Sequence, residues 1–111
     1  MSYGKLVRDK IIDIIKSNGE NPKYHTLTDE EYLIELHKKL FEEANEFVEE
    51  DSVEELADLL EVVYAIAKEK NIDLTEVENI RLKKREKRGG FDKKIYLEGV
   101  ELQNNCHTEL A

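Results

Sequence analysis

Apolar residues recur along the chain at the spacing of one helix face, in four segments separated by polar or glycine-containing breaks. The segments cover approximately residues 8–17, 28–49, 53–70 and 73–88. Residues 91–97 are partly apolar, and their pattern fits either a strand or coil. The pattern therefore predicts an all-α protein, an antiparallel bundle of about four helices.

The second segment has a well-defined start and one apolar face. Thr28 and Glu31 have the spacing of a capping box, in which the hydroxyl and the carboxylate satisfy free N–H groups at the start of a helix. At about 100° per residue, one narrow apolar stripe contains Leu33, Leu36, Leu40, Ala44 and Phe47. This stripe predicts a helix that packs along one side.

Apolar residues of the third segment lie on two sides of the expected helix. One row consists of Leu56, Ala57, Leu60, Val63, Tyr64 and Ala67, and the nearly opposite row of Leu59, Val62 and Ile66. Such a helix is expected to be central, covered by neighbouring helices or by a second subunit. We therefore expect the bundle to be completed by dimerisation or by a higher homo-oligomer.

The length of 111 residues suits one domain, assigned here to residues 1–98, followed by a polar C-terminal tail at 99–111. The single cysteine, Cys106, cannot form an intrachain disulfide and suits a reducing compartment. No apolar run near the N-terminus has the length of a signal peptide or a membrane span. These features predict a soluble, cytoplasmic protein without a membrane partner.

Charge is unevenly distributed along the chain, whose formal net charge is −9. Residues 81–94 contain eight basic and two acidic side chains, a local charge of +6, which leaves −15 for the remainder. General nucleic-acid binding relies on a large basic surface, so we expect no nucleic-acid partner. The basic strip alone supports such a partner only weakly.

Two pairs of carboxylates are placed where two helices should meet. Glu43 and Glu46 come near the end of the second segment, and Glu55 and Asp58 near the start of the third. Residues three apart share a helix side, and a short connection makes the helices antiparallel, which brings both pairs together. Partly buried carboxylates are costly without a cation, and Mg²⁺, or Mn²⁺, suits oxygen ligands shared with phosphates.

The same residues also allow a purely structural interpretation. Ser52 and Glu55 have the spacing of a capping box, although Asp51 with Glu54 has it one residue earlier and would leave Glu55 free. Fourteen of the 26 acidic residues fall between Thr28 and Glu61, and a charge run is usually a solvated helix face. Spacing alone therefore leaves a metal site and a solvated face as alternatives.

Several short stretches are similar to those of a known enzyme family. Residues 39–46 (Lys-Leu-Phe-Glu-Glu-Ala-Asn-Glu) and 55–60 (Glu-Leu-Ala-Asp-Leu-Leu) resemble the paired ExxE and ExxD motif of MazG-like nucleotide pyrophosphohydrolases. Residues 5–10 and 87–91 resemble a compact branch of that all-α superfamily, described as phosphoribosyl-ATP pyrophosphohydrolase-like. The resemblance extends from about Tyr3 to Leu97.

The resemblance implies Mg²⁺-dependent cleavage of a nucleoside triphosphate between its α and β phosphates, which gives a nucleoside monophosphate and pyrophosphate. House-cleaning of modified nucleotides is one use of that reaction. The metal would be held by residues that match the motif, namely Glu43, Glu46, Glu55 and Asp58. We expect one of the glutamates to act also as the base for a metal-bound water, with Glu61 as a reserve candidate. The interval from Glu46 to Glu55 is shorter than in typical members of the family. The nucleobase preference of the family therefore does not transfer to this chain.

Basic residues are candidates for holding the phosphates. Three of them have the spacing of one helix side, i, i+3 and i+7, namely Arg81, Lys84 and Arg88. Two more lie near the N-terminus, Lys5 and Arg8. We expect these five to bind substrate phosphates. The alternative is that they suit the negative end of a helix dipole or balance the acidic surface.

Two other functions remain open from the sequence. Hydrolysis of phosphoribosyl-ATP in histidine biosynthesis uses the same chemistry on another nucleotide, and product analysis would separate the two. A noncatalytic helical interaction module, which binds a partner through its acidic and basic faces, would show no affinity for Mg²⁺.

Overall fold

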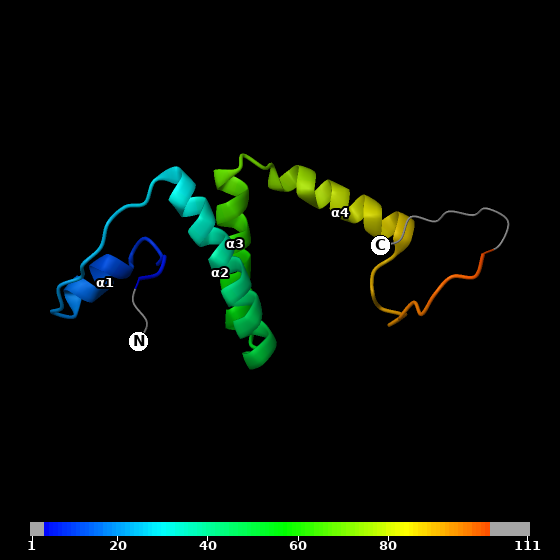
Figure 1. The fold of residues 1–111 in the computed structure, drawn as a ribbon, viewed down its shortest axis with the longest axis horizontal. Helices are drawn as coiled ribbons and strands as arrows, with labels where there is room; N and C mark the ends of the chain where they lie inside the picture. Colours follow the sequence, from blue (N-terminus) through cyan, green and yellow to red (C-terminus); the bar gives the residue numbers. More distant parts are fainter. Residues whose placement is uncertain (1–3, 103–111) are drawn as a thin grey trace. The chain divides into compact units, whose positions relative to one another are not determined.

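The computed structural model describes residues 4–102, and in that range it is all-helical with no strand. The helices are α1 (Ile11–Ser17), α2 (Asp29–Glu50), α3 (Val53–Glu69) and α4 (Leu74–Arg88), drawn in Figure 1. The predicted all-α class and the number of helices are thereby confirmed. Residues 91–97 form a turn and coil rather than a strand. Cys106 lies outside the described residues.

The chain separates into two compact units, Met1–Asp73 and Leu74–Ala111. The first unit contains α1, α2 and α3, and the second contains α4. In the first unit α1 begins three residues later than the sequence pattern predicts, because the Arg8 carbonyl accepts a turn hydrogen bond from the Ile11 N–H at 3.1 Å. In the described part of the chain, no helix is long and apolar enough to cross a bilayer.

The start of α2 is fixed by the predicted capping box. The Glu31 N–H donates to the Thr28 hydroxyl at 3.2 Å, and the Thr28 N–H donates to the Glu31 carboxylate at 3.1 Å. The hydrogen bond from the Thr28 backbone lowers the pKa of Glu31, because it stabilises the ionised carboxylate. The prediction of this cap from sequence is confirmed.

Helices α2 and α3 form an antiparallel hairpin, seen as the cyan-to-green pair in Figure 1. Asp51 ends α2 in the left-handed region, at φ 53°, and its N–H donates to the Phe47 carbonyl. Asp is one of the few non-glycine residues that adopt this conformation readily. The next residue, Ser52, is the N-cap of α3, and its hydroxyl accepts from the Glu55 N–H at 3.2 Å. The reversal is therefore complete within two residues.

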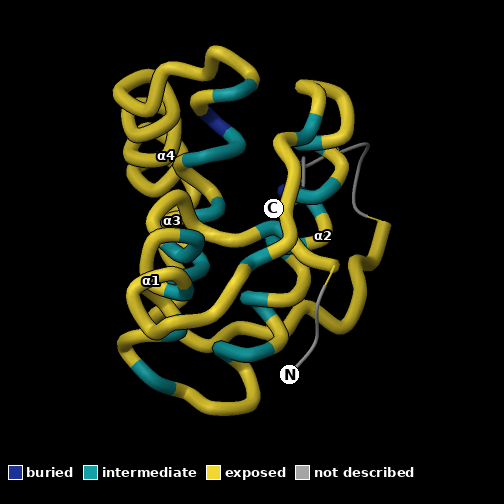
Figure 2. The backbone as a smooth tube through the Cα atoms, turned by 90° about the vertical axis from the view of Figure 1, so that its left-hand side faces the viewer, coloured by how far each residue is buried: buried dark blue, intermediate teal, exposed yellow. Residues whose placement is uncertain are grey.

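Only a small core is formed by the described residues, as the few dark blue segments of Figure 2 show. Its buried side chains are Leu36 of α2 and Ala67 of α3. On α3, the row that contains Leu59, Val62 and Ile66 is half-buried, whereas the opposite row is largely exposed. Its exposed members are Leu56, Ala57, Leu60, Val63 and Tyr64, whereas Ala67 at the end of that row is buried. The chain thus covers one of the two apolar sides that the sequence places on this helix.

Candidate metal centre and adjoining cavity

Three of the four predicted carboxylates meet at one end of the α2–α3 hairpin. Glu43 comes from α2, and Glu55 and Asp58 come from the first turns of α3. One carboxylate oxygen from each residue lies within 4.8 Å of the others. The antiparallel hairpin with its short turn produces this arrangement, because it places the last turns of α2 beside the first turns of α3.

The fourth predicted carboxylate, Glu46, lies beside this group. Its side chain is not one of the three that converge, but it forms a hydrogen bond with Glu55 and its charge acts on both Glu43 and Glu55. The reserve candidate, Glu61, is exposed and does not belong to the converging group. We call Glu43, Glu55 and Asp58 the carboxylate cluster.

The Ser52 cap leaves the Glu55 side chain available to the carboxylate cluster. The sequence offered either Asp51 with Glu54 or Ser52 with Glu55 as the cap, and the structure uses Ser52. The contact is made by the backbone N–H of Glu55, and the side-chain half of a capping box is not formed there. One residue therefore starts the helix with its backbone and supplies a carboxylate to the cluster.

Burial makes the carboxylate cluster electrostatically unfavourable without a cation. The Oε2 atoms of Glu43 and Glu55 are buried and have no hydrogen-bond partner. Burial, followed by the charge of Glu46, raises the pKa of both residues, and that of Glu55 reaches about 7. Two buried carboxylate oxygens without donors are what a bound cation would satisfy.

The donor set fits a hard divalent ion. The cluster offers oxygen ligands only, and carboxylates are the protein ligands that Mg²⁺ and Mn²⁺ prefer. Two basic residues contact the cluster from outside: the Lys39 ammonium lies 4.0 Å from Glu43 Oε1, and Arg8 forms an ion pair with Asp58. A divalent ion would therefore be held by Glu43, Glu55 and Asp58, with Glu46 adjacent to them.

Arg8 connects the N-terminal segment to the carboxylate cluster. Its Nη2 donates to Asp58 Oδ1 at 2.7 Å, although both side chains remain partly exposed. Arg8 was predicted to bind phosphate, and the structure places it next to a candidate metal ligand. Lys5, the other N-terminal candidate, is exposed and lines the same cavity as Arg8.

The three remaining phosphate candidates all lie on α4, in the second unit. Arg81 donates to Glu78 from Nε at 3.0 Å, and this hydrogen bond raises the pKa of Arg81 and lowers that of Glu78. Lys84 and Arg88 are exposed. These three residues belong to a different compact unit from the carboxylate cluster. Their phosphate role therefore stays a prediction.

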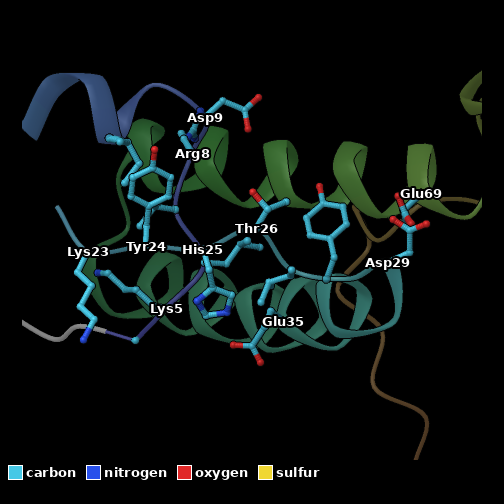
Figure 3. A pocket seen from close by; sticks show the side chains of 16 residues that line it. Lys5, Arg8, Asp9, Lys23, Tyr24, His25, Thr26, Asp29, Glu35 and Glu69 are labelled. Atoms are coloured by element: carbon cyan, nitrogen blue, oxygen red, sulfur yellow. The ribbon is translucent and has the colours of Figure 1, made fainter. Parts of the chain in front are cut away.

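A cavity of about 660 Å³ adjoins the carboxylate cluster through Arg8. Its walls come from the N-terminal segment at residues 4–9, Ile12 of α1, the loop at 23–27, the first turns of α2 and the end of α3 (Figure 3). Its size is typical of sites for small organic ligands. Sequence reasoning missed this cavity, because its lining residues are spread over five segments and follow no single spacing.

Comparison of the chain with known protein families, with curated proteins and with solved structures found no match.

The raised pKa of Glu55 predicts an unusual pH dependence for the metal-free protein. Between the ordinary value of 4.5 and about 7 the folded chain binds a proton at Glu55 that the unfolded chain has lost. Stability must then fall as pH rises through this range. We expect the melting temperature, measured by circular dichroism in a metal chelator, to be lower at about pH 8 than at about pH 5.5.

Glu55→Gln is the matched control, because it keeps the size of the side chain and removes its charge. The variant should lose most of the difference between the two pH values, and what is left should come from Glu43, whose pKa is raised as well. Adding Mg²⁺ to the unsubstituted protein at the higher pH should restore stability, since the ion compensates the buried charge. Equal pH profiles for the two proteins would contradict the electrostatic interpretation.

Proposed function

We propose that this protein is a Mg²⁺-dependent nucleoside triphosphate pyrophosphohydrolase, which cleaves between the α and β phosphates and releases a nucleoside monophosphate and pyrophosphate. The observation that carries the proposal is the carboxylate cluster, with its two buried oxygens that have no hydrogen-bond partner. The ExxE and ExxD resemblance supports it, because three of the four motif carboxylates belong to the cluster.

Each residue of the cluster has a definite task in this reaction. Glu43, Glu55 and Asp58 would hold the metal, and Glu46 adds negative charge beside them. When bound, divalent ions neutralise phosphate oxygens and make a bound water more acidic. A glutamate of the motif takes the proton from the attacking water, whose oxygen bonds to the α phosphorus while the bond to the bridging oxygen breaks and pyrophosphate leaves.

Arg8 and Lys5 supply positive charge on the cavity side of the carboxylate cluster. The Arg8 guanidinium already lies against Asp58, so a phosphate held by the metal would be within its reach. Guanidinium groups bind phosphate with two parallel N–H donors, which makes Arg8 the stronger candidate of the two. These residues hold and orient the triphosphate.

The test of the proposal is pyrophosphate release from a panel of ordinary and modified nucleoside triphosphates and phosphoribosyl-ATP, with and without Mg²⁺. The expected result is Mg²⁺-dependent release of pyrophosphate and a nucleoside monophosphate. In the cell, the cytoplasmic nucleotide pool would supply the substrate. Preference for phosphoribosyl-ATP would move the proposal to histidine biosynthesis. No release together with no Mg²⁺ affinity would favour a noncatalytic helical interaction module.

We further propose that a second copy of the chain covers the outer side of α3. That side exposes Leu56, Leu60, Val63 and Tyr64, each at least 38% exposed, in a row along one helix. Contiguous apolar patches of this kind mark association surfaces, and one helix face can pair with its own copy about a two-fold axis.

Sedimentation velocity should therefore give twice the chain mass of 13.0 kDa for the unsubstituted protein. Leu60→Lys should shift the protein to the mass of one chain, because a charged side chain cannot be buried at the centre of this face without a partner. Ile34→Lys, on an exposed position of α2, is the control and should leave the mass unchanged. A single-chain mass for the unsubstituted protein would contradict the dimer.

A further inference from the structure

The two ends of the α2–α3 hairpin carry different polar groups, with the carboxylate cluster near the turn and Tyr32 with Glu69 toward the opposite end. Tyr32 lies eleven residues before Glu43 on α2, and Glu69 lies eleven residues after Asp58 on α3. Eleven residues of an α-helix turn through about 1,100°, which is only about 20° more than three full turns. Tyr32 and Glu69 therefore share the side of the hairpin that carries the cluster, about 16 Å further along it.

Tyr32 lies close enough to Glu69 and Asp9 for their charges to act on its hydroxyl. Burial raises the pKa of the Tyr32 hydroxyl, and the negative charges of Glu69 and Asp9 raise it further. All three residues line the cavity that adjoins the cluster, and Asp29 lines it as well. The cavity lining thus combines the Tyr32 ring with the carboxylates of Asp29 and Glu69 at one end, while Asp9 lies beside Arg8 nearer its middle (Figure 3).

The charges that line the cavity differ along its length. In Figure 3 Asp29 and Glu69 lie at the right end and Lys5 and Lys23 at the left, whereas Arg8, Asp9 and Glu35 lie between the two ends. Arg8 is also the residue that contacts Asp58 of the cluster. A ligand that extends from the cluster into the cavity would place its anionic part near the cations and its other end near Tyr32 and Glu69.

We propose that this cavity binds the nucleoside part of the substrate, and that Glu69 selects nucleobases that carry an exocyclic amino group. The proposal rests on the proposed function for the identity of the ligand. Its basis is the placement of a carboxylate and an aromatic ring on the same side of the hairpin as the cluster, at the far end of one continuous cavity.

The selectivity follows from hydrogen-bond chemistry. An ionised carboxylate only accepts hydrogen bonds, so at the position of the amino group of adenine or cytosine it gains a donor, whereas hypoxanthine and uracil place a repelling carbonyl oxygen there. The ring N–H of hypoxanthine or uracil lies beside that oxygen, so selectivity requires Glu69 to face the exocyclic position. The Tyr32 ring provides an apolar surface beside which a base can lie, as aromatic side chains do in other nucleotide-binding sites. Glu69 is thus a specificity residue, and it is separate from the carboxylate cluster.

Two nucleotide pairs test this selectivity directly. ATP and ITP differ by one amino group replaced with a carbonyl, and so do CTP and UTP. We expect kcat/KM for pyrophosphate release to favour the amino member of each pair by at least about tenfold. In Glu69→Gln the amide can donate to a carbonyl, and the ratio should fall to about twofold or less. Glu30→Gln, an exposed position of α2 outside the cavity lining, is the control and should keep the original ratio.

A second readout does not depend on hydrolysis. The chain has five tyrosines and no tryptophan, so tyrosine fluorescence can report ligands that enter the cavity. AMP should change this fluorescence at lower concentrations than IMP, and Glu69→Gln should remove the difference. If the unsubstituted protein hydrolysed ATP and ITP, and CTP and UTP, with equal kcat/KM, the cavity proposal would be overturned and the proposed function would remain. If AMP bound selectively but no triphosphate were hydrolysed, the proposal that the cavity binds a nucleoside would be supported and the proposed function would be wrong.

Discussion

Glu43→Gln and Asp58→Asn are each expected to lower Mg²⁺-dependent pyrophosphate release by at least about 100-fold. Residues that merely support a metal ligand typically change affinity or activity by about 10- to 100-fold when replaced, and these two residues are proposed to be ligands themselves. An amide keeps the size of the side chain but removes the negative charge that a divalent ion requires. The fall should appear as a loss of Mg²⁺ affinity in calorimetry and as a loss of kcat/KM.

The two variants should differ in their effect on stability. Asp58→Asn weakens the ion pair with Arg8, whereas Glu43→Gln removes a charge whose protonation is already favoured by burial. The metal-free Glu43→Gln protein is therefore expected to be at least as stable as the unsubstituted one. Loss of activity without loss of stability identifies a group that is retained for function, since functional sites commonly carry unfavourable charge.

Glu42→Gln provides the matched control on the neighbouring position of α2. Glu42 is exposed and forms an ion pair with Lys39 at 3.4 Å, and it is outside the carboxylate cluster. Activity and Mg²⁺ affinity should stay within about twofold of the original values, because exposed ion pairs contribute little. Full activity in both Glu43→Gln and Asp58→Asn would show that the carboxylate cluster is not a metal centre.

The positions of the helices could be predicted because their signals are local. Apolar spacing placed α2 and α3 to within one or two residues, and the Thr28 cap was visible as a motif. The meeting of Glu43 with Glu55 and Asp58 also followed from the sequence, because a short connection admits only an antiparallel pair. These features depend on residues that are close in sequence.

Other features depend on contacts between distant segments and were not visible in the sequence. Both sides of α3 are apolar, so the pattern did not show that the Val62 side would pack on α2. The left-handed conformation of Asp51, which ends α2, is likewise not encoded in the spacing of apolar residues. The Arg8 contact with Asp58 spans fifty residues, and the cavity combines five segments, so neither has a local signature.

The largest effect on stability is expected for Leu36→Ala. Leu36 is only 3% exposed and, with Ala67, is one of the two buried apolar residues among those described. Replacing a buried leucine with alanine costs about 2 to 5 kcal/mol, and partial collapse of this small core onto the gap favours the lower half of that range. For a chain of this size, a loss of about 2 kcal/mol should lower the melting temperature by roughly 10 °C.

Ile34→Ala distinguishes core packing from helix propensity in the same helix. Ile34 lies on α2 with 57% of its surface exposed, so its replacement removes little buried area and introduces the residue with the highest helix propensity. Its free energy of unfolding in urea should stay within about 0.5 kcal/mol of the original value. If Leu36→Ala and Ile34→Ala lowered the free energy of unfolding by the same amount, burial of Leu36 could not be what stabilises the hairpin. A large loss for Leu36→Ala alone would instead show that the hairpin which brings Glu43 to Glu55 and Asp58 depends on this one buried side chain.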